Sequence, residues 1–138
     1  MNIQAVYRGQ LRLESEHVSS GAVLTTDAST EDGGGGEGFS PSDLVAAALG
    51  ACILTILGMM AKRHGWALEG AAVQVEKEMV RQPIHRIGKL ATTVTLPGGS
   101  LSDANARRRL ENAVETCPVH RSLNPEIIAP IEFVYLEG

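Results

Sequence analysis

The apolar run from Leu44 to Ala61 constrains the fold of this chain more than any other feature. Thr55 is its only strongly polar side chain, so a helix formed by the run has almost no face that suits water. A chain of 138 residues is most simply one domain, residues 1–138, and so small a domain covers such a helix with difficulty. The run therefore predicts a central buried helix that needs more cover than one copy of the chain supplies.

Signals at both ends predict where this helix begins and ends. Ser40 suits the N-cap, Pro41 suits the first helical position, and Asp43 has the spacing of a capping box. At the other end, three basic residues complement the helix dipole and Gly65 suits a left-handed cap. We therefore expect a helix from Ser42 to about His64.

The same run is long enough to raise the alternative of a transmembrane helix. It is rich in alanine and glycine, however, and no Trp or Tyr lies close to its start. The segments around it are amphipathic, as expected of a globule in water. We therefore favour a buried helix that does not enter a membrane.

Charge and composition disfavour several classes of partner. The formal net charge is -4, and the arginines at 107–109 are interpreted as a solvated helix face. No basic surface is therefore predicted for nucleic acid or for an anionic membrane. The first residues do not have the pattern of a signal peptide, so we expect a cytoplasmic protein whose thiols are reduced.

Alternating patterns predict strands on both sides of the long helix. The candidates before it are Ile3–Arg8, Gln10–Glu14 and Ala22–Thr26. After it, apolar and polar residues alternate around 73–79 and 89–96, and the turn-forming connection favours an antiparallel pair. A last strand-like stretch covers 127–136.

A second helix is predicted before this last strand. Ser102 is its expected N-cap, and apolar residues at helical spacing run from Ala106 to Cys117, which places Cys117 on the core-facing stripe. Pro118 then marks the exit from the helix. The resulting order is β-β-β-α-β-β-α-β, which belongs to the α+β class.

The segment from Asp27 to Gly38 has a different composition, with Gly33–Gly36 at its centre. It contains too few apolar residues to fold alone, and we expect a mobile loop. No GxxxxGK[ST] pattern follows the glycines, so a phosphate-binding loop has little support.

The two cysteines, Cys52 and Cys117, suggest chemistry more strongly than any other residues. If the fold brings them together, they form a redox couple with one attacking and one resolving thiol. The alternative is that each is a small apolar residue of the core, a common position for free cysteine. Cys117 and His120 have C-x-x-H spacing, but without a second Cys/His pair no metal is expected.

Two motifs resemble those of a known family. The sequence SPSDLVAAALGAC at 40–52, followed by Cys-Pro-Val at 117–119, is similar to the OsmC/Ohr family of osmotically inducible and organic hydroperoxide resistance proteins. The resemblance extends from about Gly38 to Tyr135 in motif order and cysteine spacing. It implies an OsmC-like fold and an intertwined homodimer with the cysteine-bearing helices at its centre. Such a dimer would cover the apolar helix.

The resemblance also implies a thiol-dependent peroxidase. Cys52, as a thiolate, would attack a hydroperoxide and become a sulfenic acid, and Cys117 would condense with it to form a disulfide. An external dithiol reductant would reset the enzyme, with no metal or organic cofactor. An apolar pocket at the interface would favour organic hydroperoxides over hydrogen peroxide.

The chain departs from the family pattern around the first cysteine. Peroxidases of the family have a glutamate ten positions earlier, where this chain has Ser42, and an upstream arginine beside the thiol. Arg8 and Arg12 are the upstream candidates, of which we prefer Arg12. Thr55 and His120 are further candidates for assisting the thiolate, although Thr55 could bond to its own helix and His120 could face solvent.

These departures leave a second function open. A non-peroxidatic dimer of the same family could bind a small apolar or thiol ligand, or could sense oxidants through Cys52. We favour the peroxidase, because a pair of thiols is harder to explain by packing alone.

Overall fold

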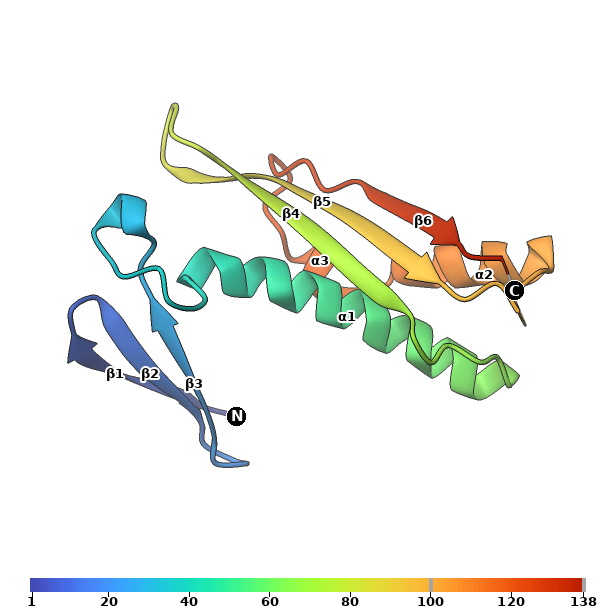
Figure 1. Ribbon diagram of the computed structural model, residues 1–138, viewed down its shortest axis with the longest axis horizontal. Helices are drawn as coiled ribbons and strands as arrows, with labels where there is room; N and C mark the ends of the chain where they lie inside the picture. The colour runs from blue at the N-terminus through green and yellow to red at the C-terminus, as the bar shows by residue number, and fades with distance from the viewer. Residues whose placement is uncertain (100, 138) are drawn as a thin grey trace. The chain divides into compact units, whose positions relative to one another are not determined.

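The computed structural model describes residues 1–99 and 101–137 and confirms the predicted α+β class and the order of the main elements (Figure 1). The elements are β1 (Ile3–Gly9), β2 (Arg12–His17), β3 (Ala22–Asp27), η1 (Thr30–Asp32), α1 (Pro41–His64), β4 (Ala72–Val80), β5 (Arg86–Leu96), α2 (Ala104–Val114), α3 (Pro118–Arg121) and β6 (Ile131–Tyr135). The chain divides into two compact units, Met1–Val45 and the part from Ala46 onward, and each is described by itself.

The N-terminal unit contains an antiparallel sheet in the order β1-β2-β3. Its first hairpin turns at Gln10 and Leu11, which have positive φ angles of 55° and 61°. The prediction of a strand over Gln10–Glu14 is therefore wrong at its start and too short at its end, because β2 runs from Arg12 to His17. Two successive left-handed residues match the twist of a two-residue hairpin, even though glycine and asparagine are more usual there.

The long helix α1 has the predicted caps at both ends. The amide of Asp43 donates to the Ser40 hydroxyl (3.2 Å), and the amide of Ser40 donates to the Asp43 carboxylate (2.9 Å), which completes a capping box. At the other end Gly65 has a φ of 74°, and the amide of Trp66 donates to the carbonyl of Ala61 (2.9 Å). The predicted helix is confirmed.

The second unit contains a sheet in the order β4-β5-β6 (Figure 1). β4 and β5 are antiparallel, as predicted, and β6 is parallel to β5. α1 approaches this sheet closely at Gly50, where an added Cβ would lie 3.0 Å from Val73 and 3.3 Å from Val75. Gly50 therefore permits a helix-to-strand distance that a larger residue would increase.

One face of α1 is buried within its own chain and the opposite face is exposed. The buried residues are Ala46, Leu49, Gly50, Ile53, Leu57 and Ala61. The exposed residues, here called the α1 stripe, are Ala47, Ala48, Ala51, Thr55, Gly58 and Met59. Among the described residues α1 is the one helix long and apolar enough to cross a membrane, a test that core helices of soluble proteins also pass. One chain thus covers the apolar run only in part.

Two expectations about α2 are wrong in detail. The N-cap is Asp103 rather than Ser102, because the Asp103 carboxylate accepts a hydrogen bond from the amide of Asn105 (3.2 Å). Arg107 was expected on a solvated face with its two neighbours. Its guanidinium instead lies over the ring of Tyr135, 4.1 Å from the ring centroid.

Candidate active site

The structure brings the two cysteine sulfurs together. The Sγ atoms of Cys52 and Cys117 lie 2.8 Å apart, and the Cys117 thiol donates to the Cys52 sulfur. A disulfide bond measures about 2.05 Å, and both cysteines are free thiols. A small movement of either sulfur would therefore bring the pair to bonding distance.

Cys117 lies after α2 rather than on its apolar stripe, because α2 ends at Val114. It is the N-cap of α3, in which Pro118 is the first residue rather than a helix exit. The amide of His120 donates to the Cys117 sulfur (3.3 Å). The side chain of Cys117 is nevertheless buried, as predicted.

Burial raises the pKa of the Cys117 thiol, and the adjacent Cys52 sulfur raises it further. The amide of His120 acts in the opposite direction but does not outweigh burial. Cys117 is therefore held as a neutral thiol, which is the form that donates a hydrogen bond to Cys52. Cys52 itself is partly exposed. A reagent in solvent consequently reaches Cys52 more readily than it reaches Cys117.

The side chains of Thr55 and His120 form hydrogen bonds with backbone carbonyls. The Thr55 hydroxyl donates to the carbonyl of Ala51 (2.7 Å), so the alternative of bonding to its own helix is confirmed. Nε2 of His120 lies 3.2 Å from the carbonyl of Ala129, which requires this nitrogen to be the donor. His120 thus contributes its backbone amide to the site, whereas sequence reasoning had pointed to its ring.

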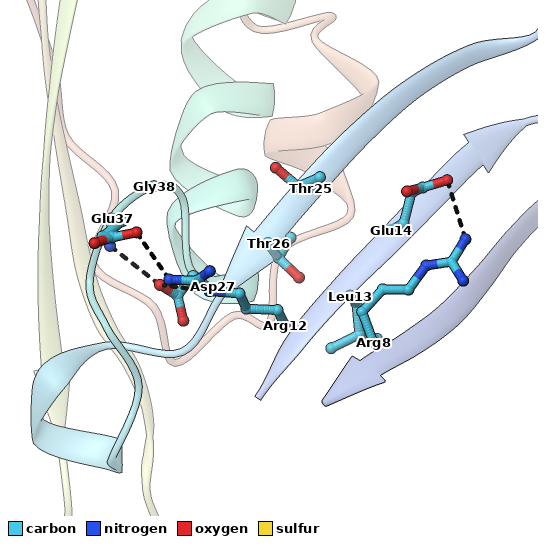
Figure 2. A pocket seen from close by; sticks show the side chains of 9 residues that line it. All are labelled: Arg8, Arg12, Leu13, Glu14, Thr25, Thr26, Asp27, Glu37 and Gly38. Carbon is cyan, nitrogen blue, oxygen red and sulfur yellow. Dashed lines mark hydrogen bonds and ion pairs between the residues drawn. The ribbon is translucent and has the colours of Figure 1, made fainter. Parts of the chain in front are cut away.

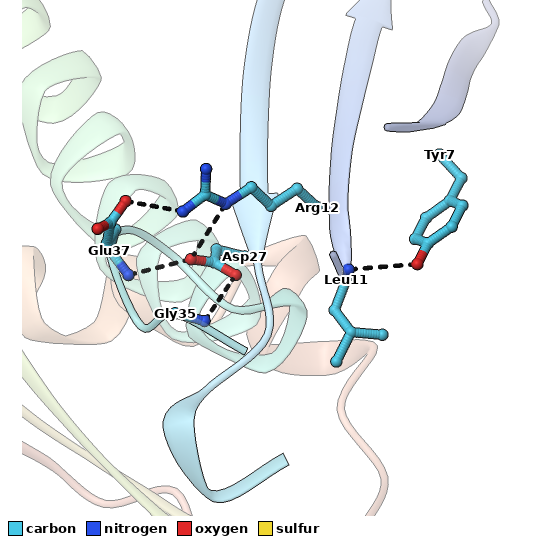
Figure 3. A network of polar contacts seen from close by, with 6 residues as sticks. All are labelled: Tyr7, Leu11, Arg12, Asp27, Gly35 and Glu37. Carbon is cyan, nitrogen blue, oxygen red and sulfur yellow. Dashed lines mark hydrogen bonds and ion pairs between the residues drawn. The ribbon is translucent and has the colours of Figure 1, made fainter. Parts of the chain in front are cut away.

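Arg12 and Ser42 lie in the N-terminal unit, where each has polar partners; those of Arg12 are drawn in Figure 3. Nη2 of Arg12 is 2.8 Å from the Glu37 carboxylate, and its Nε is 3.6 Å from that of Asp27. The Ser42 hydroxyl is 3.3 Å from that of Ser40, next to the capping box. The predicted assistance of the thiolate by Arg12 and Ser42 stays a prediction.

Asp27 organises the glycine-rich segment that was expected to be a mobile loop (Figure 3). Its side chain is only 7% exposed and accepts hydrogen bonds from the amides of Gly35 and Glu37, both at 3.2 Å. The amide of Glu37 is the main cause that lowers the pKa of Asp27, and the amide of Gly35 and the guanidinium of Arg12 add to it. The segment also contains the short helix η1 (Thr30–Asp32).

We expect acid to release this segment. The pKa of Asp27 in the native state is lower than its ordinary value of 3.8, so its stabilisation is complete above pH 3.8 and is lost as the pH falls through the native pKa. Hydrogen-exchange protection factors of Gly35 and Glu37 should fall across that acidic range. In Asp27→Asn they should already be low at neutral pH, whereas Glu16→Gln, on the same sheet, should leave them unchanged. Undiminished protection in Asp27→Asn would contradict this role.

No cluster of three or more His, Cys, Asp or Glu side chains suited to a metal ion is found in residues 1–99 and 101–137. The two cysteines give the described site the chemistry of two adjacent thiols. A partly exposed sulfur can attack, and a buried sulfur in contact with it can form a disulfide.

Known proteins share this fold over nearly the whole chain. A putative osmotic stress induced and detoxification response protein from Psychrobacter arcticus is 31% identical, with a TM-score of 0.88 and coverage of 96% of this chain and 95% of that one. An organic hydroperoxide resistance protein from Legionella pneumophila is 20% identical, with a TM-score of 0.72 and the same coverages of 96% and 95%. The organic hydroperoxide resistance protein OhrB of Bacillus subtilis is 20% identical, with a TM-score of 0.67 and 96% of each chain covered. The last two show the fold alone.

A search of curated proteins gave no match. The family described as OsmC-like protein has a model that matches residues 34–131, which is more than half of the chain. This match includes both cysteines and agrees with the resemblance of the motifs at 40–52 and 117–119. The chain belongs to the OsmC-like protein family.

Proposed function

We propose that this chain is a thiol-dependent peroxidase that reduces organic hydroperoxides. The observation that carries the proposal is the 2.8 Å contact between a partly exposed Cys52 and a buried Cys117. Two proteins with the same fold, from Legionella pneumophila and Bacillus subtilis, are named organic hydroperoxide resistance proteins, which supports this class of substrate. The exposure of the two sulfurs favours Cys52 as the attacking thiol.

The reaction proceeds in two protein-based steps. The Cys52 thiolate attacks the terminal oxygen of the hydroperoxide, the O–O bond breaks, and the leaving alkoxide takes up a proton to become an alcohol. Cys52 is then a sulfenic acid. The Cys117 sulfur attacks the Cys52 sulfur, the S–O bond breaks, and water leaves as the disulfide forms. An external dithiol supplies two electrons and two protons to restore both thiols, so no metal or organic cofactor takes part.

The proposal includes a cytoplasmic homodimer in which each copy of residues 1–138 forms one domain. The α1 stripe supports the homodimer. Five of its six residues are apolar, and all six are exposed in a single chain. Soluble proteins rarely leave a long apolar surface in water. A second copy of the chain that covers the stripe would bury these apolar residues. Neither a membrane nor a nucleic acid is then needed as a partner.

A second candidate is a non-peroxidatic dimer that binds a small apolar or thiol ligand, or senses oxidants through Cys52. The observation that favours this candidate is that Arg12 forms ion pairs with Glu37 and Asp27. These carboxylates already neutralise the arginine that we prefer as the cation for the thiolate. Ser42 also stands where family peroxidases have a glutamate. Cysteines that react rapidly with peroxides usually have a cationic side chain to stabilise the thiolate, so these two features favour the non-peroxidatic candidate.

Mass spectrometry of the oxidised thiols tests the proposal. Reduced protein is mixed with one equivalent of cumene hydroperoxide, with hydrogen peroxide in a parallel reaction, and both are quenched after a series of times. We expect loss of two hydrogen atoms and a peptide pair joined through Cys52 and Cys117, formed faster with the organic peroxide. In Cys117→Ser a dimedone adduct should appear at Cys52, because the sulfenic acid lacks its partner. Thiols that stay unchanged would overturn the peroxidase and also the oxidant sensor, and would favour a dimer that binds a small apolar or thiol ligand.

A further inference from the structure

The charged face of the N-terminal sheet holds a cavity of about 280 Å³ (Figure 2). Its charged and hydroxyl-bearing lining includes Arg8, Arg12, Glu14, Thr25, Asp27 and Glu37. Arg12 is the cross-strand partner of Asp27, and Glu14 is that of Thr25, so these side chains share one face of the sheet. The volume is near the lower limit for small-molecule sites, which begin at about 300 Å³. A ligand of only a few heavy atoms would fit.

Two carboxylates hold Arg12 in this cavity, and they differ in kind. The Asp27 side chain is 7% exposed and is fixed by two backbone amides, so it is a permanent neighbour of Arg12. The Glu37 side chain is 74% exposed although it makes the shorter contact, 2.8 Å to Nη2. Exposed ion pairs contribute little free energy and exchange readily with other partners. Glu37 is therefore the replaceable partner of Arg12.

The Glu37 side chain is free to leave without unfolding its segment. The backbone amide of Glu37 donates to the Asp27 carboxylate (3.2 Å), so the backbone is anchored independently of the side chain. Rotation of the Glu37 side chain would leave Nη2 of Arg12 facing the cavity with donors to offer. Figure 2 shows the Arg12 guanidinium between Asp27 and Glu37, on the opposite side of the cavity from the pair formed by Arg8 and Glu14.

We propose that this cavity binds a small carboxylate ligand that takes the place of the Glu37 side chain on Arg12. We infer the ligand class from the Glu37 side chain, whose carboxylate now accepts a charge-assisted hydrogen bond from Nη2 of Arg12. A ligand that replaces this side chain should carry the same group. Arg8 offers further donors on the other side of the cavity, because its contact with Glu14 is long, 3.5 Å, and its side chain is 58% exposed. The proposal concerns the N-terminal unit and does not depend on peroxidase activity.

The Glu37 side chain acts as an internal competitor in this proposal. A ligand that binds only when Arg12 is released has its apparent affinity reduced by the fraction of molecules in the released state. Removing the charge of Glu37 should therefore tighten ligand binding. Because exposed ion pairs are weak, the expected gain is about two- to fivefold in affinity.

Nuclear magnetic resonance titration of the full-length ¹⁵N-labelled protein tests this. Sodium butyrate is the probe, its neutral analogue butyramide is the matched control ligand, and sodium chloride holds the ionic strength constant. Butyrate should shift the Arg12 side-chain signals and the Glu37 amide, and Glu37→Gln should tighten binding by the stated factor. Arg12→Gln should abolish the shifts. Glu69→Gln, which removes the same charge from an exposed position in the other unit, should have no effect.

Several outcomes would overturn the proposal. These are butyramide shifts as large as those of butyrate, an unchanged affinity in Glu37→Gln, and the absence of any titration in that variant. Inorganic phosphate is titrated in parallel, and tighter binding of phosphate than of butyrate would reject a carboxylate as the ligand class. Because Glu37 is exposed, its variant keeps the fold and tests the proposal even if Arg12→Gln does not fold.

Discussion

Replacement of Cys52 by serine should abolish the reduction of organic hydroperoxides. Serine is close to cysteine in size, so α1 keeps its packing, but a hydroxyl does not form the nucleophilic anion that a thiol forms near neutral pH. We expect dithiol-dependent turnover of cumene hydroperoxide to fall by at least about 10³-fold, as for the loss of a nucleophile in other enzymes. The measurement is the steady-state rate of hydroperoxide consumption with excess dithiothreitol.

The matched variant Cys117→Ser separates the two sulfur roles. It keeps the attacking thiol, so it should still consume one equivalent of hydroperoxide in a single turnover without reductant. Far-ultraviolet circular dichroism of both variants checks that each is folded. If Cys52→Ser consumed that equivalent and Cys117→Ser did not, the assigned roles would be reversed.

A charge placed on the α1 stripe should dissociate the proposed homodimer. Ala51 lies near the middle of the stripe and is exposed in a single chain. A glutamate there would be buried without a partner at an apolar interface, at a cost of about 3–5 kcal/mol. Each subunit contributes one such glutamate, so the dimer dissociation constant should increase by at least about 10³-fold. Sedimentation velocity over a range of protein concentrations would measure the change.

Ala104→Glu is the control for this prediction. Ala104 is exposed in the first turn of α2, where a negative charge is compatible with the helix dipole. It adds the same charge outside the stripe and should leave the dimer intact. A wild-type protein that is monomeric at all concentrations would contradict the homodimer, and a dimer in Ala51→Glu would exclude the stripe as its interface.

Local signals predicted much of the fold, and they failed where long-range contacts decide. The ends of α1 could be predicted because the capping box and Gly65 act within a few residues. The first hairpin could not, because Gln10 and Leu11 are atypical of a left-handed turn and the pairing of β1 with β2 imposes it. The parallel pairing of β6 with β5 likewise depends on tertiary structure that periodicity does not contain.

The candidate site shows the same division. The proximity of Cys52 and Cys117 could be anticipated only from the family motifs. The two residues are 65 positions apart, and no local pattern links them. The Asp27 network was missed, because its donors are backbone amides of a segment whose composition indicates only flexibility. An aspartate at the end of a strand, directly before a glycine-rich segment, is the signal that could have pointed to it.

The position of Cys117 as the N-cap of α3 makes one substitution unusually informative. Its sulfur both contacts Cys52 and accepts the amide of His120. Serine is a preferred N-cap residue, so its hydroxyl can accept the same amide in Cys117→Ser, whereas Cys117→Ala loses this acceptor. A loss of redox cycling in both variants would measure the contribution of the Cys117 thiol to the chemistry. A difference between their thermal stabilities would measure the contribution of the N-cap hydrogen bond to α3.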